Sequence, residues 1–217
     1  MMKNKFKIPS TFNQLLAEEI GLHLGDGSMN YYKNKGFYQL RGHIVDDRSH
    51  YDLHIKNIYK ELFNSEIKLR EMSSTGVYGF QIWSNAMVDY KSKFLELPLG
   101  KKIDFSIPLE IRKDKELSKC FLRGYFDTDG CLYLEKKNGY FYPRIEMASI
   151  SERFIVQLKE ILTNLNFQFS YYIEDRSKYN WQNLHRIILR GNIMANKWFS
   201  EIKPANFKHI EKFNKLT

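Results

Sequence analysis

Two stretches of the chain end in the same way, and this repetition constrains the fold more than any other feature. Residues 16–27 read LAEEIGLHLGDG and residues 119–130 read KCFLRGYFDTDG. Each stretch is an apolar, helix-like run that ends on Asp-Gly and leads into a strand-like segment. The two aspartates, Asp26 and Asp129, stand 103 residues apart in a chain of 217 residues. This spacing indicates one structural unit that occurs twice.

Each apolar run also carries small residues four positions apart. The candidate helix-interface residues are Gly21, Gly25, Gly124 and Thr128. Small side chains at positions i and i+4 share one helix face and allow a second helix to approach almost to backbone contact. Packing of the two helices through these faces would bring Asp26 and Asp129 together where both helix dipoles are negative. Two carboxylates in such a place are unfavourable without a cation, so the pattern predicts a divalent metal site of the kind that binds Mg²⁺.

Residues 122–130, LRGYFDTDG, resemble the LAGLIDADG signature of homing endonucleases, and residues 19–27, EIGLHLGDG, are a looser copy. In the looser copy Leu24 stands where the family often has its first acidic residue. Both copies keep the last aspartate, which is the metal ligand of the family. Two ordinary helices that end in a common Asp-Gly turn are the alternative, and a second copy at domain-length spacing argues against it.

Composition and charge agree with a globular protein that binds a polyanion. Hydrophobic residues make up 43% of the chain and the net charge is +9. Residues 1–108 carry 15 Lys and Arg against 12 Asp and Glu, and residues 109–217 carry 19 against 13. Both halves are therefore basic, which favours nucleic acid as a partner.

Several classes of protein are excluded by what the sequence lacks. No apolar run has membrane-spanning length, and we expect neither a signal peptide nor a membrane partner. The two cysteines lack metal-ligand spacing and suggest a reducing compartment, either the cytoplasm and nucleoid or an organellar matrix. His50 and His54 are spaced for zinc on a helix, but no third ligand follows them.

The order of expected elements is αββαββα, repeated once, so the predicted fold class is α+β. We expect an N-terminal half at residues 1–108 and a C-terminal half at residues 109–217, each with one four-stranded antiparallel sheet. Thr11 and Gln14 have capping-box spacing before the first motif helix. The strands are expected at 28–34, 37–45, 66–73 and 77–83 in the first half and at 131–137, 140–149, 167–174 and 184–190 in the second. The helices other than the two motif helices are expected at 47–63, 85–96, 151–165 and 192–202.

Polar side chains alternate with apolar ones along the expected strands, which is typical of a sheet with one face on helices. The open faces would carry side chains that donate to bases and phosphates. The candidate DNA-binding residues are Gln39, Arg41, His43, Lys68, Arg70, Gln81 and Trp83 in the first half and Tyr142, Arg144, Glu146, Arg186 and Arg190 in the second. An ordinary solvated sheet face is the alternative.

The resemblance implies a monomeric endonuclease that cuts both strands of a long, imperfectly symmetric DNA site and leaves short 3′ overhangs. It implies two or three Mg²⁺ ions shared between the DNA and the protein, with Asp26 and Asp129 as ligands and the adjacent Gly25 and Thr128 as further candidates. Lys102 and Lys208 are the candidate catalytic lysines, and Asp46 and Ser149 would order solvent. Two other functions stay open on the same scaffold: a maturase that binds the host intron RNA, and a DNA-binding protein without catalysis.

Overall fold

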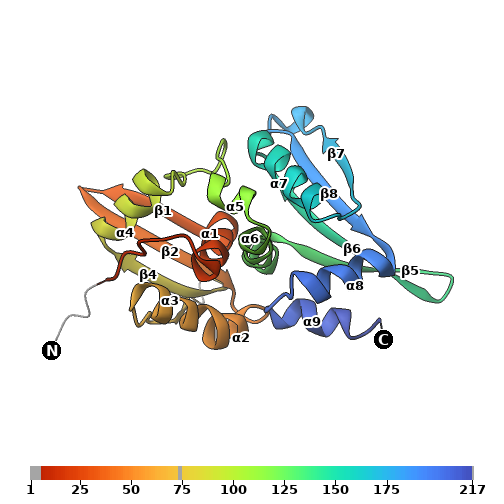
Figure 1. Ribbon diagram of the computed structural model, residues 1–217, viewed down its shortest axis with the longest axis horizontal. Coiled ribbons are helices and arrows are strands. Elements are labelled where there is room, and N and C mark those ends of the chain that lie inside the picture. Colours follow the sequence, from red (N-terminus) through yellow and green to blue (C-terminus); the bar gives the residue numbers. More distant parts are fainter. Residues whose placement is uncertain (1–5, 73–74, 217) are drawn as a thin grey trace.

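Two four-stranded antiparallel sheets flank a central pair of helices in the computed structural model, which describes residues 6–72 and 75–216 (Figure 1). The central helices are α1 and α6, and they are the two motif helices. The predicted α+β fold with two αββαββα units is confirmed.

The first unit contains one sheet with the strand order β1-β2-β4-β3. Its second helical segment runs without a break from α2 through η1 to α3, with the wider π-helical turn in the middle. The elements are α1 (Gln14–Asp26), β1 (Gly27–Tyr32), β2 (Lys35–His43), α2 (Arg48–His50), η1 (Tyr51–Ile55), α3 (Lys56–Phe63), β3 (Arg70–Met72), β4 (Val77–Trp83), α4 (Asn85–Asp89) and η3 (Tyr90–Phe94).

The second unit repeats this order with the strands β5-β6-β8-β7. Two short α-helices, α5 and α9, and the single-turn 3₁₀ helix η4 were not expected from the sequence. The elements are α5 (Leu109–Lys113), α6 (Lys115–Asp129), β5 (Cys131–Lys137), β6 (Tyr140–Ser149), α7 (Glu152–Asn164), β7 (Ser170–Glu174), η4 (Ser177–Tyr179), β8 (Leu184–Arg190), α8 (Gly191–Glu201) and α9 (Phe207–Phe213).

The two motif helices touch through their backbones. A Cβ atom built on Gly21 would lie 2.3 Å from the carbonyl oxygen of Phe121, and one built on Gly124 would lie 2.1 Å from that of Glu18. A Cβ atom on Gly25 would overlap the side chain of Thr128. The predicted interface of small residues is therefore the surface through which the two units pack.

Some predicted boundaries are wrong in detail. Asn13, and not Thr11, is the N-cap of α1, because its side chain accepts the amide of Leu16 at 2.9 Å. The strand expected at 66–73 begins only at Arg70, and residue 73 lies outside the described residues. The strand expected at 167–174 begins at Ser170. The predicted alternation holds on the central strands: Tyr38 and Leu40 are buried, as are Ile145 and Met147.

The core of the first unit encloses one ion pair. Both carboxylate oxygens of Glu19 on α1 accept from the Lys91 ammonium at 2.6 Å, and both side chains are fully buried. The hydroxyl group of Tyr59 donates to the same carboxylate at 2.5 Å. Complete hydrogen bonding makes this burial of charge tolerable. Over the part of the chain that the structure describes, we find no helix with the length and apolar character needed to cross a membrane.

Candidate active site

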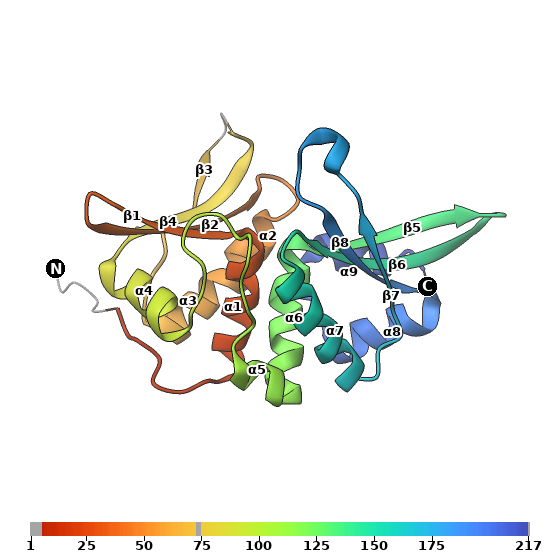
Figure 2. The same ribbon diagram turned by 90° about the horizontal axis from the view of Figure 1, so that it is seen from above.

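The two motif aspartates are the last residues of the two central helices. Asp26 ends α1 and is half-buried, and Asp129 ends α6 and is exposed. The glycine after each aspartate is extended and leads into the first strand of its unit. Helices α1 and α6 run side by side between the sheets, so their C-terminal ends, which carry the two aspartates, lie next to each other (Figure 2).

The surroundings of these carboxylates disfavour two negative charges. Burial raises the pKa of Asp26 to about 7, and the charges of Asp129 and Asp47 act in the same direction. Desolvation by the surrounding protein also raises the pKa of Asp129. Lys102 and Lys208 oppose both shifts, so all four predicted catalytic residues interact electrostatically in one place.

Lys102 caps the end of the first motif helix. Its ammonium donates to the carbonyl oxygens of His23 and Leu24 at 2.9 Å each, and also to that of Gly25. All three carbonyl groups belong to the last turn of α1, where helical partners become scarce, although that of His23 also accepts the backbone N–H of Gly27. Desolvation lowers the pKa of Lys102 to about 8, against the opposing effect of Asp129 and Asp26. The candidate metal ligand Gly25 thus already accepts one hydrogen bond.

Lys208 lies in α9, one of the helices that the sequence did not predict. Its ammonium is 2.8 Å from a carboxylate oxygen of Asp47, which belongs to the first unit. Asn206, the N-cap of α9, donates to that oxygen at 2.7 Å and to the carbonyl oxygen of Asp127 at 2.9 Å. The two lysines are therefore held differently, one by helix carbonyls and the other by a carboxylate.

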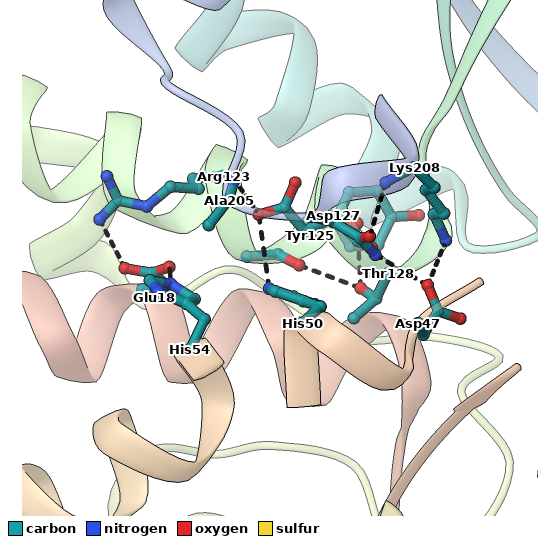
Figure 3. A network of polar contacts seen from close by, with 12 residues as sticks. Glu18, Asp47, His50, His54, Arg123, Tyr125, Asp127, Thr128, Ala205 and Lys208 are labelled. Carbon is teal, nitrogen blue, oxygen red and sulfur yellow. Dashed lines mark hydrogen bonds and ion pairs between the residues drawn. The ribbon is translucent and has the colours of Figure 1, made fainter. Parts of the chain in front are cut away.

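A chain of polar contacts crosses the interface between the units, as Figure 3 shows. Asp127 is fully buried, and its carboxylate accepts from the amide of Ala205 at 2.8 Å and lies 3.7 Å from His50. At the other end of this series of contacts, the buried Glu18 of α1 binds His54 and Arg123, each at 2.5 Å. His50 and His54 thus each face a carboxylate. Among the described residues, no group of three or more His, Cys, Asp or Glu side chains is arranged to hold a metal.

Most of the candidate DNA-binding residues lie on the sheet faces that point away from the helices. Gln39 and Arg41 alternate with buried residues on β2, and Tyr142, Arg144 and Glu146 alternate likewise on β6. The strand register places the other candidates on the same faces, namely His43, Arg70, Gln81, Trp83, Arg186 and Arg190.

Lys68 is the exception among these candidates, because it precedes β3. It lines a cavity together with Asp52, Lys56 and Lys60 of the helical segment that follows β2. The prediction that Lys68 belongs to the third strand was therefore wrong. Its prediction as a DNA-binding residue stays open.

Sequence reasoning named Asp46 where the structure brings Asp47 to the site. Asp46 is exposed and pairs with His43 at 3.2 Å, whereas the side chain of Asp47 is almost fully buried and contacts Lys208. The sequence shows Asp127 as the first acidic position of the second motif, but it does not show that Ala205 and His50 contact this carboxylate. Asn206 carried no sequence signal, because it meets Asp47 across 159 residues of chain.

Comparison with known proteins supports this architecture. Residues 116–203 match the family model of the LAGLIDADG-like domain. An uncharacterized protein of Methanocaldococcus jannaschii is 23% identical over 185 residues, which are 82% of this chain and 65% of that protein. The chain is also 24% identical, over 86% of its length, to 16% of the glutamine–fructose-6-phosphate aminotransferase of the same organism. The chain thus spans less than two thirds of these relatives.

Solved structures share the fold over nearly the whole chain. A variant of the homing endonuclease I-DmoI, in complex with its nicked target DNA, matches with a TM-score of 0.61 and 14% identity over 89% of this chain and 97% of that one. The LAGLIDADG meganuclease I-AabMI, bound to uncleaved DNA, matches with a TM-score of 0.56 and 14% identity over 94% and 90%. The second unit therefore contains a LAGLIDADG-like domain, and the first unit repeats the motif, the strand order and the helix packing of the second.

Proposed function

We propose that this protein is a metal-dependent endonuclease that cuts double-stranded DNA at a long, asymmetric site. The observation that carries the proposal is the meeting of Asp26 and Asp129 at the adjacent ends of α1 and α6. Lys102 binds the last carbonyl groups of α1, and Lys208 pairs with Asp47. A relative of this fold is described in complex with its nicked target DNA in the presence of Mn. Two carboxylates with neighbouring ammonium groups suit the hydrolysis of a phosphodiester.

The donor set fits a hard divalent cation. Three carboxylates, those of Asp26, Asp129 and Asp47, meet two lysines here, and burial together with the charges of the other two carboxylates raises the pKa of Asp26 to about 7. Oxygen ligands with this charge suit Mg²⁺. A carbonyl oxygen has two lone pairs, so Gly25 keeps one for a metal while it accepts from Lys102. When bound, the cation would polarise the phosphate and activate water.

The chain's own residues would orient the phosphates and offset charge. Lys102 and Lys208 each bring an ammonium toward the carboxylate pair from a different unit, which suits one lysine to each scissile phosphate. Both would stabilise the negative charge that develops on the attacked phosphate. Asp47 and the three α1 carbonyl groups hold these ammonium groups in place before DNA binds.

The open sheet faces would bind the duplex on either side of this centre. Each sheet would lie in the major groove of one half-site, where arginine and glutamine side chains can read base edges. With the two carboxylates between the half-sites, a single chain acting as a monomer would cut both strands and leave short 3′ overhangs.

Selection from a random pool tests the proposal. The protein is incubated with randomised linear duplexes and Mg²⁺, and cleaved molecules are captured by their ends, amplified and sequenced. We expect one long recurrent site with 3′ overhangs, and no cleavage in EDTA. Selective duplex binding without cleavage would indicate a DNA-binding protein without catalysis. Binding of a structured intron RNA in preference to all duplexes would indicate a maturase.

A further inference from the structure

The open faces of the two sheets differ in their charge pattern. The described strands β1–β4 present three cationic side chains on their open face, Lys35, Arg41 and Arg70, and no carboxylate. Glu71 of β3 lies on the helix side, where it binds Arg48. The first open face is therefore purely cationic over these strands.

The open face of β5–β8 carries both signs of charge. The strand register puts four cationic residues there together with three carboxylates, which are Glu135, Glu146 and Glu174. This is the reverse of the bulk composition, because residues 109–217 have the larger excess of basic residues. Net charge of the halves thus does not predict which sheet attracts phosphates more strongly.

Two of the arginines on the second face are already paired with carboxylates. Arg186 donates to Glu174 at 2.8 and 2.6 Å and also binds Glu146. Arg144 binds Glu135, which lies 3.1 Å from Lys137 as well. On the first face, by contrast, neither arginine pairs with a carboxylate of residues 6–72 or 75–216. Arg41 donates to the sulfur of Met72, and Arg70 binds the neutral amide of Gln81.

These contacts predict different responses to DNA. An arginine without a carboxylate partner binds any phosphate favourably, and this attraction does not depend on sequence. An arginine that is paired with a carboxylate must break that ion pair before it can bind DNA. The carboxylate itself is repelled by the DNA phosphates. A guanine edge can repay that exchange with two hydrogen bonds, and the released carboxylate can accept from the amino group of cytosine. Only a matching sequence offers both.

We propose that the two sheets divide the recognition of DNA between them. The first sheet supplies affinity that depends on salt and little on sequence, and the second supplies discrimination, with Glu146 and Glu174 holding Arg186 until a matching base pair replaces them. This inference rests on the proposed function, and it names the half-site that faces β5–β8 as the one where substitutions are penalised most.

The test uses a Glu146→Gln/Glu174→Gln variant, which removes the two charges and keeps the shape of the side chains. Dissociation constants are measured in Ca²⁺ for the duplex selected above and for two duplexes with one half-site scrambled. The half-site that faces the second sheet is the one whose base preference Arg144→Ala relaxes, because Arg144 belongs to the paired arginines of that face. A Glu110→Gln/Glu160→Gln variant, with both changes on helices of the same unit, is the matched control.

We expect the carboxylate variant to bind the duplex with the scrambled second half-site more tightly than the unmodified protein does. Discrimination against that duplex should fall about tenfold, within the range of one base-reading pair. The salt slope should steepen by about one for each additional phosphate that the variant neutralises. Discrimination in the half-site that faces the first sheet should stay unchanged. The control variant should keep both the discrimination ratio and the salt slope of the unmodified protein.

An unchanged discrimination ratio in a protein that binds the selected duplex would overturn this inference and leave the proposed function standing. A protein that selects no duplex at all would instead refute the proposed function.

Discussion

Replacement of Gly21 or Gly124, the two glycines where the motif helices touch through their backbones, by alanine should destabilise the protein. A glycine inside an exposed helix is about 1 kcal/mol less favourable than alanine, so helix propensity alone predicts stabilisation. Here the added Cβ atom would lie 2.3 Å from a backbone oxygen at Gly21 and 2.1 Å from one at Gly124. Neither backbone can rotate away, so α1 and α6 must separate along their whole contact.

Overpacking costs about 1–3 kcal/mol, and contact between two backbones belongs at the upper end. After the favourable change in propensity we expect a net loss of about 2 kcal/mol for Gly21→Ala or Gly124→Ala. For a chain of this size, that loss lowers the melting temperature by about 4–8 °C. Thermal denaturation followed by circular dichroism measures it, and Gly100→Ala, where nothing lies within 4 Å but the φ angle is +70°, reports backbone strain without a clash. An alanine variant at either helix position that melts at or above the unmodified protein would refute the predicted backbone contact.

Three further predictions concern charge. Asp26→Asn should raise the melting temperature at pH 8 without metal. The pKa of Asp26 is raised to about 7 in the folded protein, so the folded state loses stability as the pH rises through that value and this carboxyl group ionises. The gain should vanish toward pH 4, and an equal gain at both pH values would contradict the assignment. Lys91→Met should lower the free energy of unfolding by about 3–5 kcal/mol in urea denaturation, because Glu19 keeps a buried charge, and Glu19→Leu/Lys91→Met should recover most of that loss. Arg144→Ala should weaken binding of the selected duplex by about 1–3 kcal/mol and relax base preference in its own half-site, whereas Arg41→Ala should weaken binding of all duplexes alike. Unchanged affinity in both variants would exclude these strands as the DNA surface.

The fold was predictable because its strongest signals are local and occur twice. Small residues at fixed spacing, Asp-Gly ends and alternation along the strands all depend on short segments. The elements that sequence reasoning missed depend on distant contacts instead. Helix α9 has only seven residues, and its N-cap Asn206 binds Asp47 and the carbonyl oxygen of Asp127.

The candidate site divides in the same way. Asp26 and Asp129 follow from the motif, and Lys102 and Lys208 from equivalent places after each unit's last predicted helix. The capping of α1 by Lys102 could not be read from the sequence, because the lysine meets carbonyl groups 77 to 79 residues away. The choice between Asp46 and Asp47 also depends on the turn after β2, which directs the side chain of Asp47 inward and that of Asp46 outward. Two adjacent aspartates in a sequence do not reveal this orientation.

The most direct test of the proposed nuclease replaces one carboxylate at a time. Asp26→Asn and Asp129→Asn are each assayed with the selected duplex in Mg²⁺, with binding in Ca²⁺ measured in parallel and each DNA strand labelled separately. An amide cannot neutralise a divalent cation, so we expect both variants to lose double-strand cleavage while they bind the duplex at least as well as the unmodified protein. Undiminished cleavage of both strands by either variant would contradict the assignment of these aspartates as the metal-binding pair.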